Sequence, residues 1–140
     1  MGKSIQDVMT QNPCAIDANQ PVSYAAKMMR DEDVGLAPIV EGDRLIGTLT
    51  DRDIAVRVVA EGRDPQTVNV REVASTDVIT VDPQQGLDEA LKLMARHQVR
   101  RLPVVEEDGR LVGVIAQADV ADEAKAKKVG ELVEEISRDA

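Results

Sequence analysis

The chain is 140 residues long, with 43% hydrophobic residues, 31% charged residues and a formal net charge of −9, which predicts a globular domain with an acidic surface. Such a surface repels phosphate backbones and anionic lipids, and one Tyr with no Phe or Trp offers few rings for base stacking, so we expect no nucleic-acid or membrane partner. One cysteine excludes an internal disulfide framework, and no apolar run reaches membrane length or resembles a signal peptide, so we predict a cytoplasmic protein.

Two copies of one pattern run along the chain and keep the same register almost from end to end. A shift of 65 residues pairs Pro38 with Pro103, and one inserted residue in the turn at 106–110 lengthens the shift to 66, which pairs Gly47 with Gly113. A unit of about 60 residues is marginally stable alone. We therefore predict that the two copies pack side by side and share one core.

In chain order, the first copy begins with a polar cap at Ser4 and a short helical turn, followed by an extended segment at 14–17. A helix comes next, because apolar residues recur at the spacing of one buried stripe. These residues are Val22, Ala25, Ala26 and Met29. Two short strands at 37–40 and 45–50 flank a turn, and a second helix starts at Asp51.

The second copy repeats this order, with a cap at Asn69 and a second helix that starts at Gln117. Its extended segment is 79–82, its strands are 102–105 and 111–116, and its helical stripe is Leu87, Ala90, Leu91 and Met94. The fold class is therefore α/β (α+β), with two β-α-β-β-α repeats. The predicted boundaries are 1–62 for the first repeat, 63–69 for a linker that contains Pro65, 70–123 for the second repeat and 124–140 for a C-terminal helix.

This order of elements and motifs resembles a tandem pair of CBS domains, the module named after cystathionine β-synthase. The segments that carry the resemblance are DVMT, CAID and APIVEGDRLIGTLTDRDI in the first half, and EVAS, VITV and RLPVVEEDGRLVGVIAQADV in the second. The resemblance implies a flat module whose repeats are related by a pseudo-two-fold axis, with two clefts between them. It also implies clefts that bind adenine nucleotides or S-adenosyl compounds, a homodimer formed through the helices, and regulation of a partner protein.

The motif GTLTDRD, residues 47–53, matches the ligand signature of the family at Gly47, Thr50 and Asp53, and departs from it at Thr48, where a hydrophobic residue is usual. Thr50 lies where a strand becomes a helix, so its hydroxyl and the free N–H groups of the first turn point to one spot that favours a phosphate. Asp53 has two acceptor oxygens that suit the paired hydroxyls of a ribose. The same spacing of Thr and Asp also forms a capping box that binds no ligand, and both interpretations stay open.

The second copy has GVIAQAD at residues 113–119, with Ala116 in place of Thr50 and with Asp119 retained. A carboxylate that served only as the partner in a capping box would have less reason to persist once the threonine is lost. We therefore predict ribose binding in both clefts, with phosphate held well in only one of them.

The resemblance implies that each cleft takes its Ser/Thr and Asp from one repeat and its adenine-lining residues from the other. The first cleft would contain Thr50, Asp53, Ser75, Ile79, Val99, Arg100 and Arg101. The second cleft would contain Asp119, Thr10, Cys14, Val34, Gly35 and Leu36. Arg100 and Arg101 supply guanidinium groups suited to a phosphate, whereas the equivalent Gly35 and Leu36 carry no charge. The alternative is that both arginines pair with surface carboxylates.

Catalysis and metal binding find little support in the sequence. His97 is the single histidine, and with Cys14 it falls short of the four ligands of a structural zinc site. No GxxxxGK[ST] loop is present, and one His and one Cys do not assemble a nucleophile, a base and an orienting group. We predict no enzymatic activity, no metal and no required cofactor.

The leading hypothesis is a regulatory module that senses AMP, ADP, ATP or S-adenosylmethionine between its repeats. Binding would shift the packing of the two halves, and an unidentified partner protein would respond in trans. The alternative is a stress-associated interaction protein with vestigial clefts, which Ala116 and the uncharged second cleft motivate.

Overall fold

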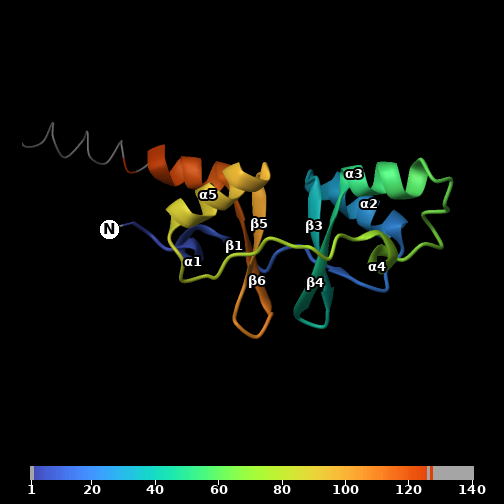
Figure 1. Cartoon of the computed structure of the whole chain (residues 1–140), viewed down its shortest axis with the longest axis horizontal. Helices are drawn as coiled ribbons and strands as arrows, with labels where there is room; N and C mark the ends of the chain where they lie inside the picture. The colour runs from blue at the N-terminus through green and yellow to red at the C-terminus, as the bar shows by residue number, and fades with distance from the viewer. Residues whose placement is uncertain (1, 126, 128–140) are drawn as a thin grey trace, which may run out of the picture.

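The computed structural model describes residues 2–125 and 127, and its strands form two three-stranded sheets that stand side by side (Figure 1). One sheet has the order β2-β3-β4 and the other has the order β1-β6-β5. We call the half built around the first of these sheets the first unit and the other half the second unit. The α/β repeat architecture expected from the sequence is confirmed.

The strands of the first unit and the helices α2, α3 and η1 come from the first sequence repeat. Its elements are β2 (Ile16–Asp17), α2 (Val22–Glu32), β3 (Leu36–Glu41), β4 (Arg44–Thr50), α3 (Asp51–Ile54) and the π-helix η1 (Ala55–Val59). β3 pairs with β2 in parallel and with β4 in antiparallel fashion, and β4 leads directly into α3. The stripe of α2 is buried on this sheet through Val22, Ala25 and Met29, as its spacing predicts.

The second unit repeats the arrangement with one difference in its short strands. Its elements are β1 (Thr10–Gln11), α5 (Leu87–His97), β5 (Arg101–Val105), β6 (Leu111–Ala116) and a helix at 117–125. β6 lies between β5 and β1 and is antiparallel to both. The segment 79–82, expected to be extended, contributes an isolated parallel bridge between Val81 and Val104 rather than a strand.

The first helical turn of each repeat packs in the opposite unit. Ile5 of α1 (Ile5–Val8) is buried in the core of the second unit, and Val70 and Val73 of α4 (Val70–Val73) are buried in the core of the first. Figure 1 shows the same exchange, with α1 beside α5 and α4 beside α2. Ser4 bridges to Gly86 and Asn69 bridges to Pro21, which are equivalent pairs under the repeat. We call 3–9 and 68–75 the exchanged segments.

The repeated glycine has a structural cause at the border between the units. A Cβ at Gly47 would lie 2.7 Å from the Ser75 carbonyl oxygen, and a Cβ at Gly113 would lie 2.5 Å from Met9 Sδ and 2.8 Å from the carbonyl oxygen of the next residue, Thr10. Thr48 and Ser75 exchange two backbone hydrogen bonds of 2.9 and 2.8 Å across the first of these contacts. Glycine is therefore needed twice because an exchanged segment lies directly on each of these strands.

Two expectations from the sequence are wrong, and a third concerns residues that the structure mostly does not describe. The buried residues form two clusters, one in each unit, instead of one shared core. Leu91, placed in the buried stripe of the second copy, is 37% exposed, and Leu93 packs against the core instead. The predicted C-terminal helix at 124–140 lies mostly outside the described residues. Within the described part of the chain, no helix combines the length and the apolar character that a membrane span requires.

Candidate functional site

Two neighbouring cavities lie where the units meet, with volumes of about 260 and 880 Å³. The smaller cavity is lined by Leu36, Thr48, Thr50, Asp53, Ser75, Asp77, Val78, Ile79, Val99, Arg101, Leu102 and Pro103. The larger cavity is lined by Asp33, Gly35, Leu36, Asp51, Val99, Arg100, Arg101, Ala116, Gln117, Ala118 and Ala121. Leu36, Val99 and Arg101 belong to both linings, so the two cavities adjoin.

The smaller cavity brings together most residues predicted for the first cleft. Its lining includes Thr50 and Asp53 from the first unit and residues from the second repeat on the other side. The predicted residues found there are Thr50, Asp53, Ser75, Ile79, Val99 and Arg101. Arg100, predicted with them, lines the larger cavity next door. Thr48 and Asp77 were missed, although each flanks a predicted residue on the same strand or loop.

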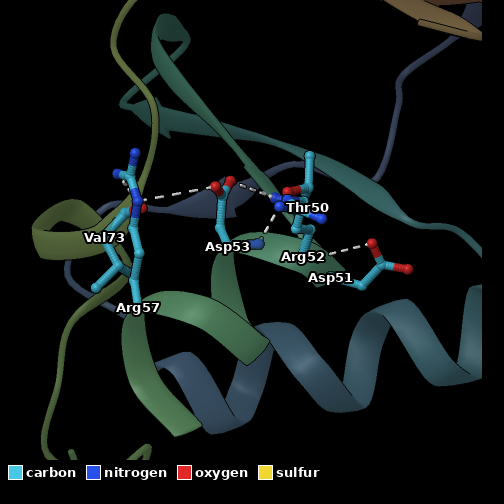
Figure 2. Close-up of polar contacts among 6 residues, drawn as sticks. All are labelled: Thr50, Asp51, Arg52, Asp53, Arg57 and Val73. Carbon is cyan, nitrogen blue, oxygen red and sulfur yellow. Dashed lines mark hydrogen bonds and ion pairs between the residues drawn. The ribbon is translucent and has the colours of Figure 1, made fainter. Parts of the chain in front are cut away.

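Thr50 and Asp53 form a complete capping box at the start of α3 (Figure 2). The Thr50 hydroxyl accepts a hydrogen bond from the Asp53 N–H at 3.1 Å, and Asp53 Oδ2 accepts one from the Thr50 N–H at 2.9 Å. The capping box that the spacing predicts is therefore present. The box leaves the hydroxyl hydrogen of Thr50 and further lone pairs of Asp53 for other partners, so the same side chains can also contact a ligand.

Arg57, one turn after Asp53, connects this carboxylate to α4 (Figure 2). Its Nη1 donates to the Val73 carbonyl oxygen at 3.1 Å, and its Nε lies 4.0 Å from Asp53 Oδ1. The side chain of Asp53 is only 18% exposed, whereas that of Arg57 is 52% exposed. The guanidinium thus joins a cavity-lining carboxylate to the exchanged segment that carries Ser75.

Arg100 and Arg101 line the larger cavity together with the carboxylates of Asp33 and Asp51. Among the described residues, neither takes part in an ion pair, whereas Arg63, Arg71 and Arg110 each pair with a glutamate. The alternative interpretation, in which both arginines pair with surface carboxylates, is therefore not supported by the described part of the chain. In a protein with a net charge of −9, these guanidinium groups place positive charge beside the Asp33 and Asp51 carboxylates of the same lining, and a guanidinium group suits an anion.

The residues predicted for the second cleft do not gather in either cavity. Gly35 lines the larger cavity and Leu36 lines both cavities, but Asp119, Thr10, Cys14 and Val34 line neither of the two. Thr10 pairs with Val114 in the sheet, Val34 packs against the core of the first unit, and Cys14 is an exposed free thiol.

Asp119 keeps a structural role without a threonine. Its Oδ2 accepts a hydrogen bond from the Ala116 N–H at 3.3 Å, which is the second half of the capping box seen at Thr50. The retention of this carboxylate is thus explained by helix capping, and the inference of ribose binding from its persistence loses its basis.

Metal ligands and perturbed ionisable groups do not gather at these cavities. Among the described residues, no group of three or more His, Cys, Asp or Glu is placed to hold a metal ion. The pKa of Asp7 lies below its usual value because the Asp7 carboxylate accepts hydrogen bonds from the Ser4 N–H and hydroxyl. The pKa of Arg110 is raised because its guanidinium donates a hydrogen bond to the Glu106 carboxylate. Neither residue lines the two cavities.

Both halves of the chain match the same family of known proteins. The model of the CBS domain family matches residues 5–60 and 70–126. The CBS domain-containing protein YhcV of Bacillus subtilis is 46% identical over 118 residues, which are 84% of this chain and 83% of that protein.

Solved structures share the fold. Hypoxic Response Protein I, crystallised with two coordinated zinc ions, superposes with a TM-score of 0.79 at 39% identity and covers 86% of this chain and 98% of its own. CBSX2 in complex with AMP superposes with a TM-score of 0.79 at 23% identity and covers 91% of this chain and 99% of its own.

Proposed function

Because the chain belongs to the CBS-domain family and carries two copies of the domain, we propose that it is a regulatory module that binds an adenine nucleotide or an S-adenosyl compound between its units. Binding shifts the packing of the two units, and a partner protein in trans responds to that shift. The module itself performs no catalysis.

The single observation that carries this proposal is the pair of adjoining cavities with complementary chemistry. The smaller cavity offers apolar walls for an adenine and the Asp53 carboxylate for ribose hydroxyls. The larger cavity, whose lining also includes Asp33 and Asp51, offers the guanidinium groups of Arg100 and Arg101 for a phosphate or carboxylate group of the same ligand. Among the described residues, neither arginine takes part in an ion pair. CBSX2, which has the same fold, holds AMP.

A second candidate function is a stress-associated interaction protein with vestigial clefts. It is favoured by the capping box, which already satisfies Thr50 and Asp53 without a ligand, and by the similarity to Hypoxic Response Protein I. This candidate predicts no nucleotide affinity tighter than the millimolar range.

We propose that the module acts as a homodimer and that the first unit supplies the contact. Tyr24, Val56 and Val59 are 50, 48 and 69% exposed on α2 and η1. The equivalent positions of the second repeat hold the charged residues Glu89, Asp122 and Lys125. Only the first unit therefore presents apolar side chains at these positions for a second copy to cover.

Calorimetric titration with AMP, ADP, ATP and S-adenosylmethionine tests the proposal. We expect micromolar binding of at least one of these compounds, weakened by about tenfold or more in Asp53→Ala. Asp7→Ala is the matched control, because it removes the same kind of capping box from α1, which lines neither cavity. No binding of any of the four compounds would favour the interaction protein, and equal affinity of Asp53→Ala would overturn the residue assignment.

A further inference from the structure

In each unit, the residue at one equivalent position of the repeat contacts an exchanged segment. This residue is positively charged in the first unit and negatively charged in the second. In the first unit this position is Arg57, whose guanidinium donates to the Val73 carbonyl oxygen of α4 at 3.1 Å. In the second unit the equivalent position is Glu123, whose carboxylate pairs at 3.0 Å with Lys3, directly before α1. Both contacts hold the second helix of a unit to the segment that arrives from the other repeat.

The two contacts differ in what they share with the cavities. Arg57 also faces Asp53 at 4.0 Å, and Asp53 lines the smaller cavity. Glu123 carries the same charge as the equivalent carboxylate Asp119, so it cannot form such a pair. The Lys3–Glu123 pair, with side-chain exposures of 57 and 30%, is also somewhat more open to solvent than the Arg57–Asp53 pair, with exposures of 52 and 18%, so salt screens it more.

The backbone conformation around Arg57 also differs from that around Glu123. Arg57 lies in η1, where the helix widens to a π-helix and the Ala60 N–H reaches back to the Ala55 carbonyl oxygen at 2.9 Å. The equivalent part of the second repeat, within 117–125, is α-helical. Single π-turns inside helices are frequent at functional sites, and this one carries the residue that connects Asp53 to α4.

We infer that Arg57 couples ligand binding at Asp53 to the exchanged segment 68–75, whereas the Lys3–Glu123 pair holds the segment 3–9 independently of any ligand. The coupling rests on the function proposed above. A ligand that fills the smaller cavity expels water from around Asp53, and the lower local dielectric strengthens the attraction between Asp53 and Arg57. Arg57 then holds the Val73 carbonyl more firmly. Ser75, two residues further along, lines the same cavity, so this segment meets the ligand as well.

Hydrogen exchange followed by mass spectrometry tests the coupling, with AMP as the probe. The reporting amides are those of Ala74 and Ser75, which donate to Val70 and Thr48 at 2.9 and 2.8 Å. In the unmodified protein, saturating AMP is expected to slow exchange in the segment 68–75. In Arg57→Met this slowing is expected to become smaller at saturating AMP and to be lost at Ala74, which does not line the cavity, while Ser75 keeps the part that comes from its own place in the lining. The affinity for AMP falls about five- to tenfold.

Two further variants separate coupling from general damage. Arg57→Lys retains the charge beside Asp53 but presents a point charge instead of a planar fork, so part of the AMP effect returns. Glu123→Gln removes the corresponding contact in the second unit. It is expected to speed exchange in 3–9 without ligand and to leave both the AMP affinity and the slowing in 68–75 unchanged.

The outcomes distinguish this inference from the proposed function. Equal AMP-induced slowing in Arg57→Met and in the unmodified protein would overturn the coupling while nucleotide binding stands. If AMP does not bind, hydrogen exchange measured without ligand still shows whether the contact between Arg57 and the Val73 carbonyl oxygen stabilises the segment 68–75. Faster exchange of 68–75 in Arg57→Met would then support a structural tie without signalling, and the inferred coupling to AMP would be overturned.

Discussion

Gly47→Ala is expected to strain the border between the units. The added Cβ would lie 2.7 Å from the Ser75 carbonyl oxygen, a distance that real Cβ atoms essentially never show. The obstacle is backbone, so it cannot rotate away as a side chain would. Relief requires the exchanged segment to retreat by several tenths of an ångström, which stretches the two hydrogen bonds of 2.9 and 2.8 Å between Thr48 and Ser75.

The magnitude follows from these contacts. Overpacking of this kind costs about 1–3 kcal/mol, and weakening one of the two hydrogen bonds adds about 1 kcal/mol. Replacing glycine by alanine also restricts the unfolded chain, which offsets about 0.4–1 kcal/mol. We expect Gly47→Ala to lower the free energy of unfolding by about 2 kcal/mol. Gly113→Ala should also be destabilising, because its Cβ would meet Met9 Sδ at 2.5 Å, which can move aside, and the Thr10 carbonyl oxygen at 2.8 Å, which is backbone.

Urea unfolding followed by far-ultraviolet circular dichroism measures the effect, since the chain has no Trp for fluorescence. Gly86→Ala is the matched control, because nothing lies within 4 Å of a Cβ at that position. As Gly86 is the N-cap of α5, its replacement by alanine should cost less than about 1 kcal/mol. A loss at Gly47 no larger than that at Gly86 would refute the explanation of why the glycine occurs twice.

Two further predictions concern association and acid stability. Val59→Lys, which copies the charge of the equivalent Lys125, should turn the proposed dimer into a monomer in sedimentation equilibrium, whereas Leu91→Lys on α5 should leave the association state unchanged. The pKa of Asp7 is lowered in the folded protein, so its ionised carboxylate stabilises the fold above the usual pKa, and this contribution is lost as the pH falls below about 4. Asp7→Asn should therefore flatten the fall of the thermal midpoint between about pH 5 and pH 3, and an unchanged slope would contradict the role of this capping box.

The repeat, the order of the elements and the two buried helical stripes could be predicted because they depend on local periodicity. The shift that pairs Pro38 with Pro103 aligns strands, turns and helix starts in both copies, and the helices at Val22 and Leu87 begin where their stripes begin. Leu91 was placed wrongly, since a stripe defined by spacing alone includes positions at its edge that the neighbouring elements do not cover.

The exchange of the first helical turns could not be predicted from the pattern. The turns after Ser4 and Asn69 have the same kind of capping box and the same apolar spacing, so the local pattern does not assign either turn to a core. Which core each one joins is set by long-range contacts, such as the hydrogen bonds of 2.8 Å from Ile5 to Gln85 and of 2.9 Å from Val70 to Gln20. Local propensity carries no information about such distant partners.

The candidate site was predicted unevenly for a related reason. The first cleft follows from one motif and from the position of Ser75, which lies on an exchanged segment beside Thr48. The second cleft was built by applying the same rule to the other copy, but there Thr10 belongs to β1 and Val34 packs against the core. A sequence repeat fixes equivalent backbones without fixing equivalent cavities, because the cavities depend on side chains that differ between the copies.

The second copy lacks the hydroxyl of Thr50 because Ala116 stands at that position. A larger difference between the two copies is the charge at another equivalent position, which holds Arg57 in the first copy and Glu123 in the second. Asp119 survives without a threonine because it still caps the Ala116 N–H, so the conserved carboxylate says little about ligand binding in the second unit. Arg57 and Glu123 differ in sign, and only Arg57 lies beside a cavity-lining carboxylate. If the two units respond unequally to a ligand, this position gives the physical reason. In the first unit, the side chain that holds the exchanged segment also lies beside a cavity-lining carboxylate, whereas in the second unit it pairs with the surface residue Lys3.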